Sequence, residues 1–264
     1  MHTLATLYQL RAHLGLAPTD TADDPRLIDA LESATAHIER HAARRFIPRR
    51  AALPHHYTSG LDLLLNDDLL ELTALTNGDG SSINLADVIA LPAQPPYSLL
   101  RLTGSSAFNW SLSPLNALTV TGLWGWHERP AESWRASADT VHDNPLTSSS
   151  VTLTVGDADG ADSAARSPRF QTGQLLKLED EFCVVLAVST ATNTLIIQRA
   201  AYGTTAAAHP LGTPIAVYQP PAELESLALR WAAWLYREAD SAPIPAVPAA
   251  FHECLAVFRR LRVR

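Results

Sequence analysis

The sequence has few of the features that mark secreted or membrane proteins. Its 264 residues include only two cysteines, Cys183 and Cys254, and both lie in apolar surroundings. This usage fits buried free thiols and not a disulfide framework. No apolar run approaches the roughly 20 residues of a membrane-spanning helix, and residues 1–16 lack the basic start and long apolar stretch of a signal peptide. We therefore expect neither a membrane protein nor one secreted through a signal peptide.

Lysine is almost absent, and acidic residues outnumber basic ones. There are 20 basic and 27 acidic residues, which gives a net charge of −7 with neutral histidines, and Lys177 is the one lysine. Wrapping nucleic acid requires a basic face, so this balance does not favour it. The arginine preference fits a GC-rich genome, and the alternative is a use of guanidinium groups in interfaces.

Motifs of nucleotide binding, hydrolysis and metalloprotease chemistry are missing. The chain has no Gly-x-Ser-x-Gly, no Gly-rich loop followed by Lys-Ser/Thr, no Gly-x-Gly-x-x-Gly and no His-Glu-x-x-His. The weak candidates that remain are Asp157, Asp159, Asp162, His55, His56, His209, Trp124, Trp126, Trp231 and Trp234. Turns, loops and core packing explain each of them better than chemistry does. We predict no catalytic residue, no cofactor and no metal.

Apolar periodicity predicts a pair of helices at the N-terminal end. The first covers residues 3–15, with Thr3 as its cap and Gly15 as its end. The second begins at 23–25, where the sequence Asp-Asp-Pro supplies a cap and a favourable first helical residue, and reaches about Arg45. Its apolar residues recur at spacings of four and three, as on one helix face: Leu27, Leu31, Ala34 and Ile38.

Two later regions have the composition of strands. In the first, strands are expected at 57–65, 69–76, 83–91, 98–102 and 117–122, with a hairpin turn at 77–80 (Asn-Gly-Asp-Gly). In the second, they are expected at 151–155, 174–178, 182–188, 194–199 and 214–218. Further helices are expected at 131–140, at 224–236 and at 249–261.

These elements predict an α+β fold. It consists of a helical bundle with a small antiparallel sheet, interrupted by an inserted all-β domain of the small sandwich or barrel type. The predicted boundaries are 1–145 for the N-terminal helices and sheet, 146–219 for the inserted antiparallel β domain, and 220–264 for the C-terminal helices and basic tail.

Four short segments follow one another in a characteristic order. They are the helix pair at 3–45, Arg44-Arg45-Phe46 with a proline close behind, the stretch 116–125 (Asn-Ala-Leu-Thr-Val-Thr-Gly-Leu-Trp-Gly), and the Trp-rich helix 228–237. This order resembles the head–tail connector (adaptor) proteins of tailed bacteriophages, over residues 3–130 and 220–240. The segment 146–219 departs from compact members of that family. Its phrase at 199–210 (Arg-Ala-Ala-Tyr-Gly-Thr-Thr-Ala-Ala-Ala-His-Pro) resembles inserted modules of longer phage connectors.

The resemblance implies a structural virion protein and not an enzyme. Such a protein is made in the host cytoplasm and forms a dodecameric ring at the virion neck. The implied partners are other copies of the chain, the portal, a stopper or tail-completion protein, and double-stranded DNA that passes through without specific binding. A lining of carboxylates would let DNA slide, because it repels phosphates; candidates for it are Asp62, Asp67, Asp68 and Glu71.

Two groups of residues are the predicted contact sites. Residues 259–264 carry four arginines, and the resemblance implies that this tail reaches into the portal; a solvated helix end is the alternative. The candidate portal contacts are Phe258, Arg259, Arg260, Leu261, Arg262 and Arg264. The candidate contacts between subunits are Arg44, Arg45, Phe46, Trp231 and Trp234.

Two other functions compete with the connector. The first is a stopper or tail-completion protein of the same neck, which we expect to have a more purely β core. The second is a β-sandwich carbohydrate-binding or hydrolytic module, which would bind glycans through exposed tryptophans.

Overall fold

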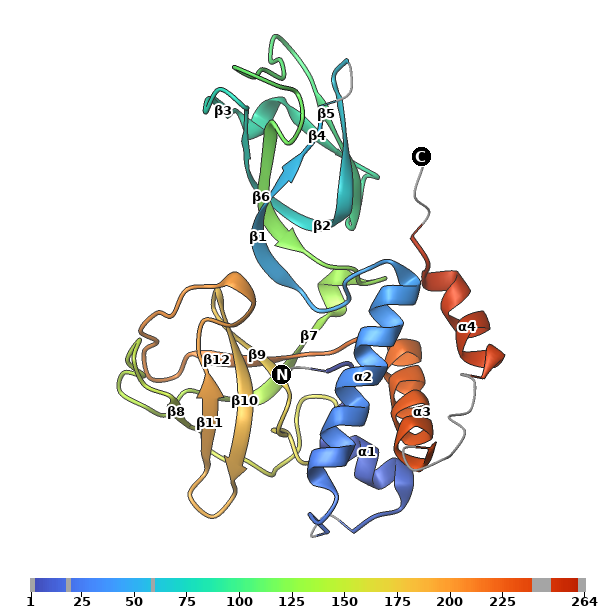
Figure 1. The fold of residues 1–264 in the computed structure, drawn as a ribbon. Coiled ribbons are helices and arrows are strands. Elements are labelled where there is room, and N and C mark those ends of the chain that lie inside the picture. Colours follow the sequence, from blue (N-terminus) through green and yellow to red (C-terminus); the bar gives the residue numbers. More distant parts are fainter. Residues whose placement is uncertain (1–2, 18–19, 58–59, 239–247, 261–264) are drawn as a thin grey trace. The chain divides into compact units, whose positions relative to one another are not determined.

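The computed structural model describes residues 3–17, 20–57, 60–238 and 248–260 (Figure 1). Within these residues the chain forms four α-helices and twelve strands, and the strands make two antiparallel sheets of six strands each. Backbone contacts divide the chain into two compact units. Arg44–Pro130 form the sheet unit, and Met1–Ala43 together with Ala131–Arg264 form the helix–sheet unit.

The sheet unit has the strand order β1-β6-β2-β5-β4, with β3 paired to β2. Its strands are β1 (Arg49–His55), β2 (Asp62–Thr76), β3 (Ser82–Ile83), β4 (Val88–Leu91), β5 (Tyr97–Leu102) and β6 (Leu118–Trp124). A single 3-10 turn, η1 (Leu85–Asp87), precedes β4. The turn predicted at 77–80 joins β2 to β3, where the Asn77 N–H donates to the Ser81 carbonyl at 2.8 Å.

The end of β6 explains why tryptophan and glycine stand together in the segment 116–125. Trp124 is fully buried, and its Nε1–H donates to the Ala51 carbonyl at 2.9 Å. A Cβ on Gly122 would lie 2.1 Å from the Glu71 carbonyl oxygen, so only glycine fits there. Gly125 has a φ of +145°, which L side chains rarely adopt. The spacing of these residues is set by the packing of β1, β2 and β6.

The helix–sheet unit contains the second sheet, with the order β7-β12-β9-β10-β11-β8. Its strands are β7 (Trp134–Thr140), β8 (Thr152–Thr154), β9 (Leu175–Leu178), β10 (Glu181–Ser189), β11 (Thr194–Gln198) and β12 (Pro214–Tyr218). Fully buried aliphatic and aromatic side chains such as Leu176, Leu195 and Phe170 form its core. Each sheet therefore has a hydrophobic core of its own.

The helices of this unit are α1 (Leu7–Leu14), α2 (Asp24–Ala42), α3 (Ala222–Glu238) and α4 (Ala249–Leu255), followed by the 3-10 turn η4 (Ala256–Phe258). α2 packs along α3, and α1 contacts both (Figure 1). The apolar face predicted for α2 is confirmed, because all four of its residues are buried. Thr6, and not Thr3, caps α1: its side chain accepts from the Gln9 N–H in a capping box.

The predicted fold class is wrong. The structure consists mostly of two antiparallel sheets with four short helices, and it is not a helical bundle with an inserted β domain. The helix predicted at 131–140 is a 3-10 turn, η2 (Pro130–Glu132), followed by β7. β7 pairs with β12 with Trp134 opposite Tyr218, and the Trp134 ring lies 5.0 Å from that of Phe182. Pairing and ring packing outweigh the local helix preference of this segment.

Two helix ends also differ from the predictions. α2 ends at Ala42 and not near Arg45, because Ala43 adopts the left-handed conformation with a φ of 52°. The last helix ends at Leu255 instead of continuing to residue 261. Across the described residues, the helices are too short or too polar to span a lipid bilayer.

Candidate functional site

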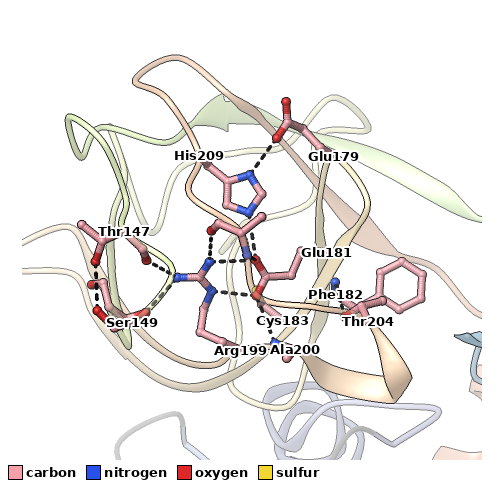
Figure 2. A network of polar contacts seen from close by, with 12 residues as sticks. Thr147, Ser149, Glu179, Glu181, Phe182, Cys183, Arg199, Ala200, Thr204 and His209 are labelled. Carbon is pink, nitrogen blue, oxygen red and sulfur yellow. Dashed lines mark hydrogen bonds and ion pairs between the residues drawn. The ribbon is translucent and has the colours of Figure 1, made fainter.

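Figure 2 shows a buried group of charged side chains in the helix–sheet unit. Glu181 opens β10, Arg199 directly follows β11, and His209 lies in the loop before β12. Their side chains are 0%, 6% and 1% exposed, respectively. Because burying a charge is costly unless it is paired, the partners of each group decide what the site can do.

Arg199 uses every N–H donor of its guanidinium group. Its Nε and Nη2 donate to the two carboxylate oxygens of Glu181, each at 2.7 Å. Its Nη1 donates to the backbone carbonyls of Thr147 at 2.7 Å and Ser150 at 3.0 Å. A second bond from Nη2 reaches the Ala207 carbonyl at 2.5 Å. The arginine thus ties three backbone carbonyls, from two segments of the chain, to one carboxylate.

Glu181 is the acceptor at the centre of the group. It accepts from the backbone N–H groups of Ala200 and Ala207, each at 3.0 Å, and from His209 Nε2 at 2.9 Å. Burial alone would raise the pKa of this carboxyl group. The hydrogen bonds from Arg199, from both backbone N–H groups and from His209 outweigh burial and lower the pKa from 4.5 to about 2. Glu181 therefore stays ionised and cannot act as a general acid near neutral pH.

The Cys183 thiol and the His209 ring of the cluster also have polar partners. The Cys183 thiol contacts Glu181 Oε1 at 3.5 Å, and burial raises its pKa well above the usual range, so the thiol stays protonated and unreactive. His209 Nδ1 lies 2.9 Å from Glu179 Oε2, so both ring nitrogens have partners. The interpretation of His209 as a satisfied loop histidine is confirmed. This cluster anchors the loop after β11 and contains no free base or nucleophile.

The loop itself explains the phrase at 199–210. The turn η3 (Ala201–Gly203) requires left-handed backbone at Ala200 and Tyr202, with φ values of 53° and 51°. The Thr204 hydroxyl donates to the Ala201 carbonyl at 2.8 Å and accepts from the Phe182 N–H at 3.0 Å. The arginine, threonine and histidine of this phrase thus have structural roles in closing one loop.

Acid is expected to destabilise the helix–sheet unit through Glu181. Because the folded pKa is about 2 and the ordinary value is 4.5, the stabilising contribution is complete above pH 4.5 and is lost as the pH falls toward 2. The full effect is on the order of 3 kcal/mol. Denaturant titrations between about pH 6 and pH 3 should show the stability gap between the wild-type protein and Glu181→Gln shrinking as the pH falls. A gap that stays constant would contradict this assignment.

Three other weak candidates from the sequence, Asp157, Asp162 and His55, also have structural partners. Asp157 Oδ1 accepts from the Gly160 N–H at 3.0 Å, and Asp162 Oδ1 accepts from the Ala164 N–H at 2.8 Å, so both carboxylates close turns. His55 is buried, and its ring stacks on Trp124 at 5.6 Å. Among the residues that the structure describes, no three His, Cys, Asp or Glu side chains are grouped to hold a metal ion.

The predicted portal contacts fall in two places. Phe258 is buried, with an exposure of 6%, and Arg259 follows it at the surface. The Arg260 N–H donates to the Ala42 carbonyl at 2.8 Å, which fixes the backbone at this point to the end of α2. Leu261, Arg262 and Arg264 lie outside the described residues. Phe258 thus has little surface left for another protein.

Two of the residues predicted to lie between subunits, Arg44 and Phe46, are engaged within the sheet unit. Phe46 is fully buried and packs edge-on against Trp126, with ring centroids 5.7 Å apart. The Arg44 guanidinium lies 5.1 Å from the Trp126 ring centroid and pairs with Asp68 at 2.9 Å. Arg45 is exposed, and its carbonyl accepts from the Trp126 N–H at 2.7 Å.

The two predicted tryptophans of α3 differ in exposure. Trp231 is fully buried, with His37 stacked at 5.5 Å and Phe251 stacked at 5.0 Å. Trp234 is half-buried, and its ring meets Phe251 edge-on at 6.3 Å. Of the five residues predicted to pack between subunits, Arg45 is exposed, Arg44 and Trp234 are half-buried, and Phe46 and Trp231 are buried.

The four acidic residues predicted as channel-lining candidates each form an ion pair within the sheet unit. The pairs are Asp62–Arg101, Asp67–Arg49, Asp68–Arg44 and Glu71–Arg50, at 2.6, 3.0, 2.9 and 3.9 Å. A paired carboxylate presents less net negative charge to a passing phosphate than a free one. The negative potential of these four residues is therefore partly neutralised.

An apolar groove that the sequence did not predict lies in the helix–sheet unit. It has a volume of about 200 Å³, and its lining includes Leu7 of α1, Ile28 and Leu31 of α2, and Val185 and Leu186 of β10. The register of β10 against β11 shifts between Val185 and Ala187. Leu186 lies within this irregularity and is 47% exposed. An alternating strand pattern does not reveal a register shift of this kind.

Comparison of the sequence with protein-family models and with curated proteins gives no match.

Proposed function

We propose that this chain is a structural virion protein that forms a ring between the capsid portal and the tail of a tailed bacteriophage. DNA would pass through the ring without specific binding. The ring's partners would be the portal and a stopper or tail-completion protein, at the virion neck. The ordered resemblance of residues 3–130 and 220–240 to head–tail connectors is the sequence basis for this function.

The observation that carries the proposal is direct contact between the first and last segments of that resemblance. Gln9 Nε2 in α1 donates to Glu225 Oε1 in α3 at 2.5 Å. The Tyr236 hydroxyl in α3 donates to Asp23 Oδ2, at the start of α2, also at 2.5 Å. Segments that resemble one family by sequence order alone need not meet in space. Their packing as one layer of helices supports their being parts of one module.

A second candidate is a stopper or tail-completion protein of the same neck. We expect such proteins to have a more purely β core than connectors. The sequence predicts a helical bundle, which argues against this candidate. The two six-stranded sheets favour it. The helical layer of α1, α2 and α3 favours the connector.

Electron microscopy of the protein mixed with the portal encoded in the same genome tests the proposal. A connector should add rotationally symmetric density directly beneath the portal. Density that appears only when another neck protein is already bound to the portal would favour the stopper or tail-completion candidate. A protein that adds no density to either assembly would contradict both.

A truncation separates the role of the basic tail from that of the folded helices. Removing residues 261–264 keeps Phe258 in its buried position and keeps the Arg260–Ala42 backbone bond. If the tail inserts into the portal, this variant should fold normally and bind the portal at least about tenfold more weakly. An unchanged affinity for the portal would rule out a contribution of residues 261–264 to portal binding.

A further inference from the structure

We propose that mild acid releases the last helical segment of the described chain, α4 with η4, from the surface of α2 and α3. Release follows protonation of three histidines that meet where α4 packs. They are His37 and His41 of α2 and His252 of α4, and they form the histidine cluster. All three belong to the helix–sheet unit. This switch goes beyond the proposed function and operates whether or not the chain forms a ring.

The α4 segment is attached through a narrow apolar stripe. Phe251, Leu255 and Phe258 are 6%, 2% and 6% exposed, while the residues between them are exposed. The backbone bond from the Arg260 N–H to the Ala42 carbonyl links the end of the segment to the end of α2. A helix of seven residues is marginal in water when it is isolated. The place and the shape of α4 therefore depend on its contact with α2 and α3.

The histidine cluster surrounds the tryptophan on which α4 packs. The Trp231 ring of α3 stacks on Phe251 of α4 at 5.0 Å and on His37 at 5.5 Å. The His41 and His252 rings lie 5.9 and 6.0 Å from the Trp231 ring. They lie 4.6 Å from each other, although they come from different helices. Charge on these rings is therefore placed at the contact between α4 and the other helices.

The hydrogen bond of His37 requires a neutral ring. Arg40 Nη2 lies 2.7 Å from His37 Nδ1. A guanidinium group only donates, so Nδ1 accepts and carries no proton. Protonation of Nδ1 would make two donors face each other and would add a second positive charge beside the guanidinium group. The folded arrangement thus fits the neutral form of His37 only.

Burial and three neighbouring groups oppose the charged form of His37. Burial has the largest effect, and Arg40, His41 and His252 add to it, so the pKa of His37 lies below its ordinary value of 6.5. None of these three groups is a carboxylate. Because His37 is harder to protonate in the packed state, the packing loses stability as the pH falls below 6.5.

The elements that meet at the cluster bring further cations. Arg230 of α3 lies 5.9 Å from the Phe251 ring centroid, and Arg260 is fixed to the end of α2 by its backbone bond. The carboxylate beside the cluster in sequence is Glu253 of α4, which is exposed to solvent and does not act on His37. Protonated His41 and His252 would repel each other, and departure of α4 separates them.

Hydrogen exchange of backbone amides, followed by mass spectrometry on the full chain, tests this release. Exchange is compared at about pH 7.5 and about pH 5.0, a range in which histidine titrates, and each rate is corrected for the intrinsic effect of pH. We expect residues 249–258 to lose protection at least about tenfold at the lower pH. Peptides from α3 and β10 should keep their protection. The lower pH stays above 4.5, so Glu181 still makes its full contribution.

The double variant His37→Gln/His252→Phe removes two of the titrating groups. Glutamine keeps an acceptor for Arg40, and phenylalanine keeps an aromatic ring beside His41. Protection of residues 249–258 should then differ by less than about twofold between the two pH values. The matched control is His13→Gln, because His13 is an exposed histidine of α1 outside the cluster. This control should respond to pH as the wild-type protein does.

Three results would overturn the switch. They are equal protection of residues 249–258 in the wild-type protein at both pH values, a pH response that survives in the double variant, and a simultaneous loss of protection in α3 and β10. If the double variant releases α4 at both pH values, Arg40→Gln decides, because it leaves all three rings in place. Removal of this cation should move release to a lower pH than in the wild-type protein, and an unchanged midpoint would also overturn the switch.

Discussion

Arg199→Met is expected to destabilise the helix–sheet unit by about 3–5 kcal/mol, because it leaves a buried carboxylate without its main partner. Glu181 is fully buried and receives two hydrogen bonds from Arg199. The substitution also leaves the carbonyls of Thr147 and Ser150 without the bonds that Arg199 donates to them. Denaturant unfolding followed by far-ultraviolet circular dichroism measures the loss.

Arg101→Met is the matched control. Arg101 also donates from Nε and Nη2 to one carboxylate, that of Asp62, at 2.6 and 2.7 Å. This pair is exposed to solvent, so water replaces the lost bonds and little change in stability is expected. If both variants lose the same stability, burial is not what gives the Arg199 pair its importance.

Trp231→Ala is expected to cost about 3–5 kcal/mol in the isolated chain, because it opens a cavity between three helices. Trp231 is fully buried, and its ring stacks on His37 from α2 and on Phe251 from α4. The predicted effect is on folding of one subunit and not on association between subunits. Thermal unfolding of dilute protein, where subunits stay apart, measures it.

Trp234→Ala tests whether the other tryptophan of α3 packs between subunits. Trp234 is half-buried and contacts Phe251 only by a ring edge at 6.3 Å, so its removal should affect stability much less. If Trp234 packs between subunits, this variant should weaken ring formation while the subunit stays folded. A Trp231 variant that stays fully stable but fails to assemble would contradict the intrachain role assigned to Trp231.

Elements with a local cause were predictable from the sequence. Pro25 lies in the first turn of α2, as predicted, and the turn at 77–80 depends on its own Asn and Gly residues. The predicted capping bond from Asp23 is absent, because the Asp23 side chain makes no bond to the helix N–H groups and accepts instead from the Tyr236 hydroxyl. Most strands of the second sheet were also found close to their observed bounds, because short runs between turn residues identify them.

Elements that depend on distant partners were not predictable in this way. The local sequence of β7 predicts a helix, because its partner strand, β12, lies more than 70 residues later. The local sequence of β1 does not predict a strand, because it contains Pro54, which is tolerated there since β1 is the edge strand of its sheet. Without β1 and β7, the predicted elements contain too little sheet and too much helix. This is why the predicted fold class is a helical bundle with an inserted β domain.

One feature of the sequence indicates the buried charged cluster. Glu181 stands at the start of a strongly apolar run, Phe-Cys-Val-Val, and a carboxylate in such a position requires a partner. Arg199 directly follows the next strand, β11, which pairs with β10, so this hairpin would bring its guanidinium group alongside. The groove had no comparable signal, because it depends on the packing of helices against β10.

The loop anchored by Glu181 gives a way to find remote relatives. Thr204 and His209 follow Arg199 by five and ten residues, and the glutamate precedes it by eighteen. Each of these four side chains is hydrogen-bonded to the loop backbone or to β10, and Arg199 also reaches the carbonyls of Thr147 and Ser150. Chains that diverged beyond alignment would still have to keep this spacing to fold the loop, so the spacing itself is a searchable fingerprint.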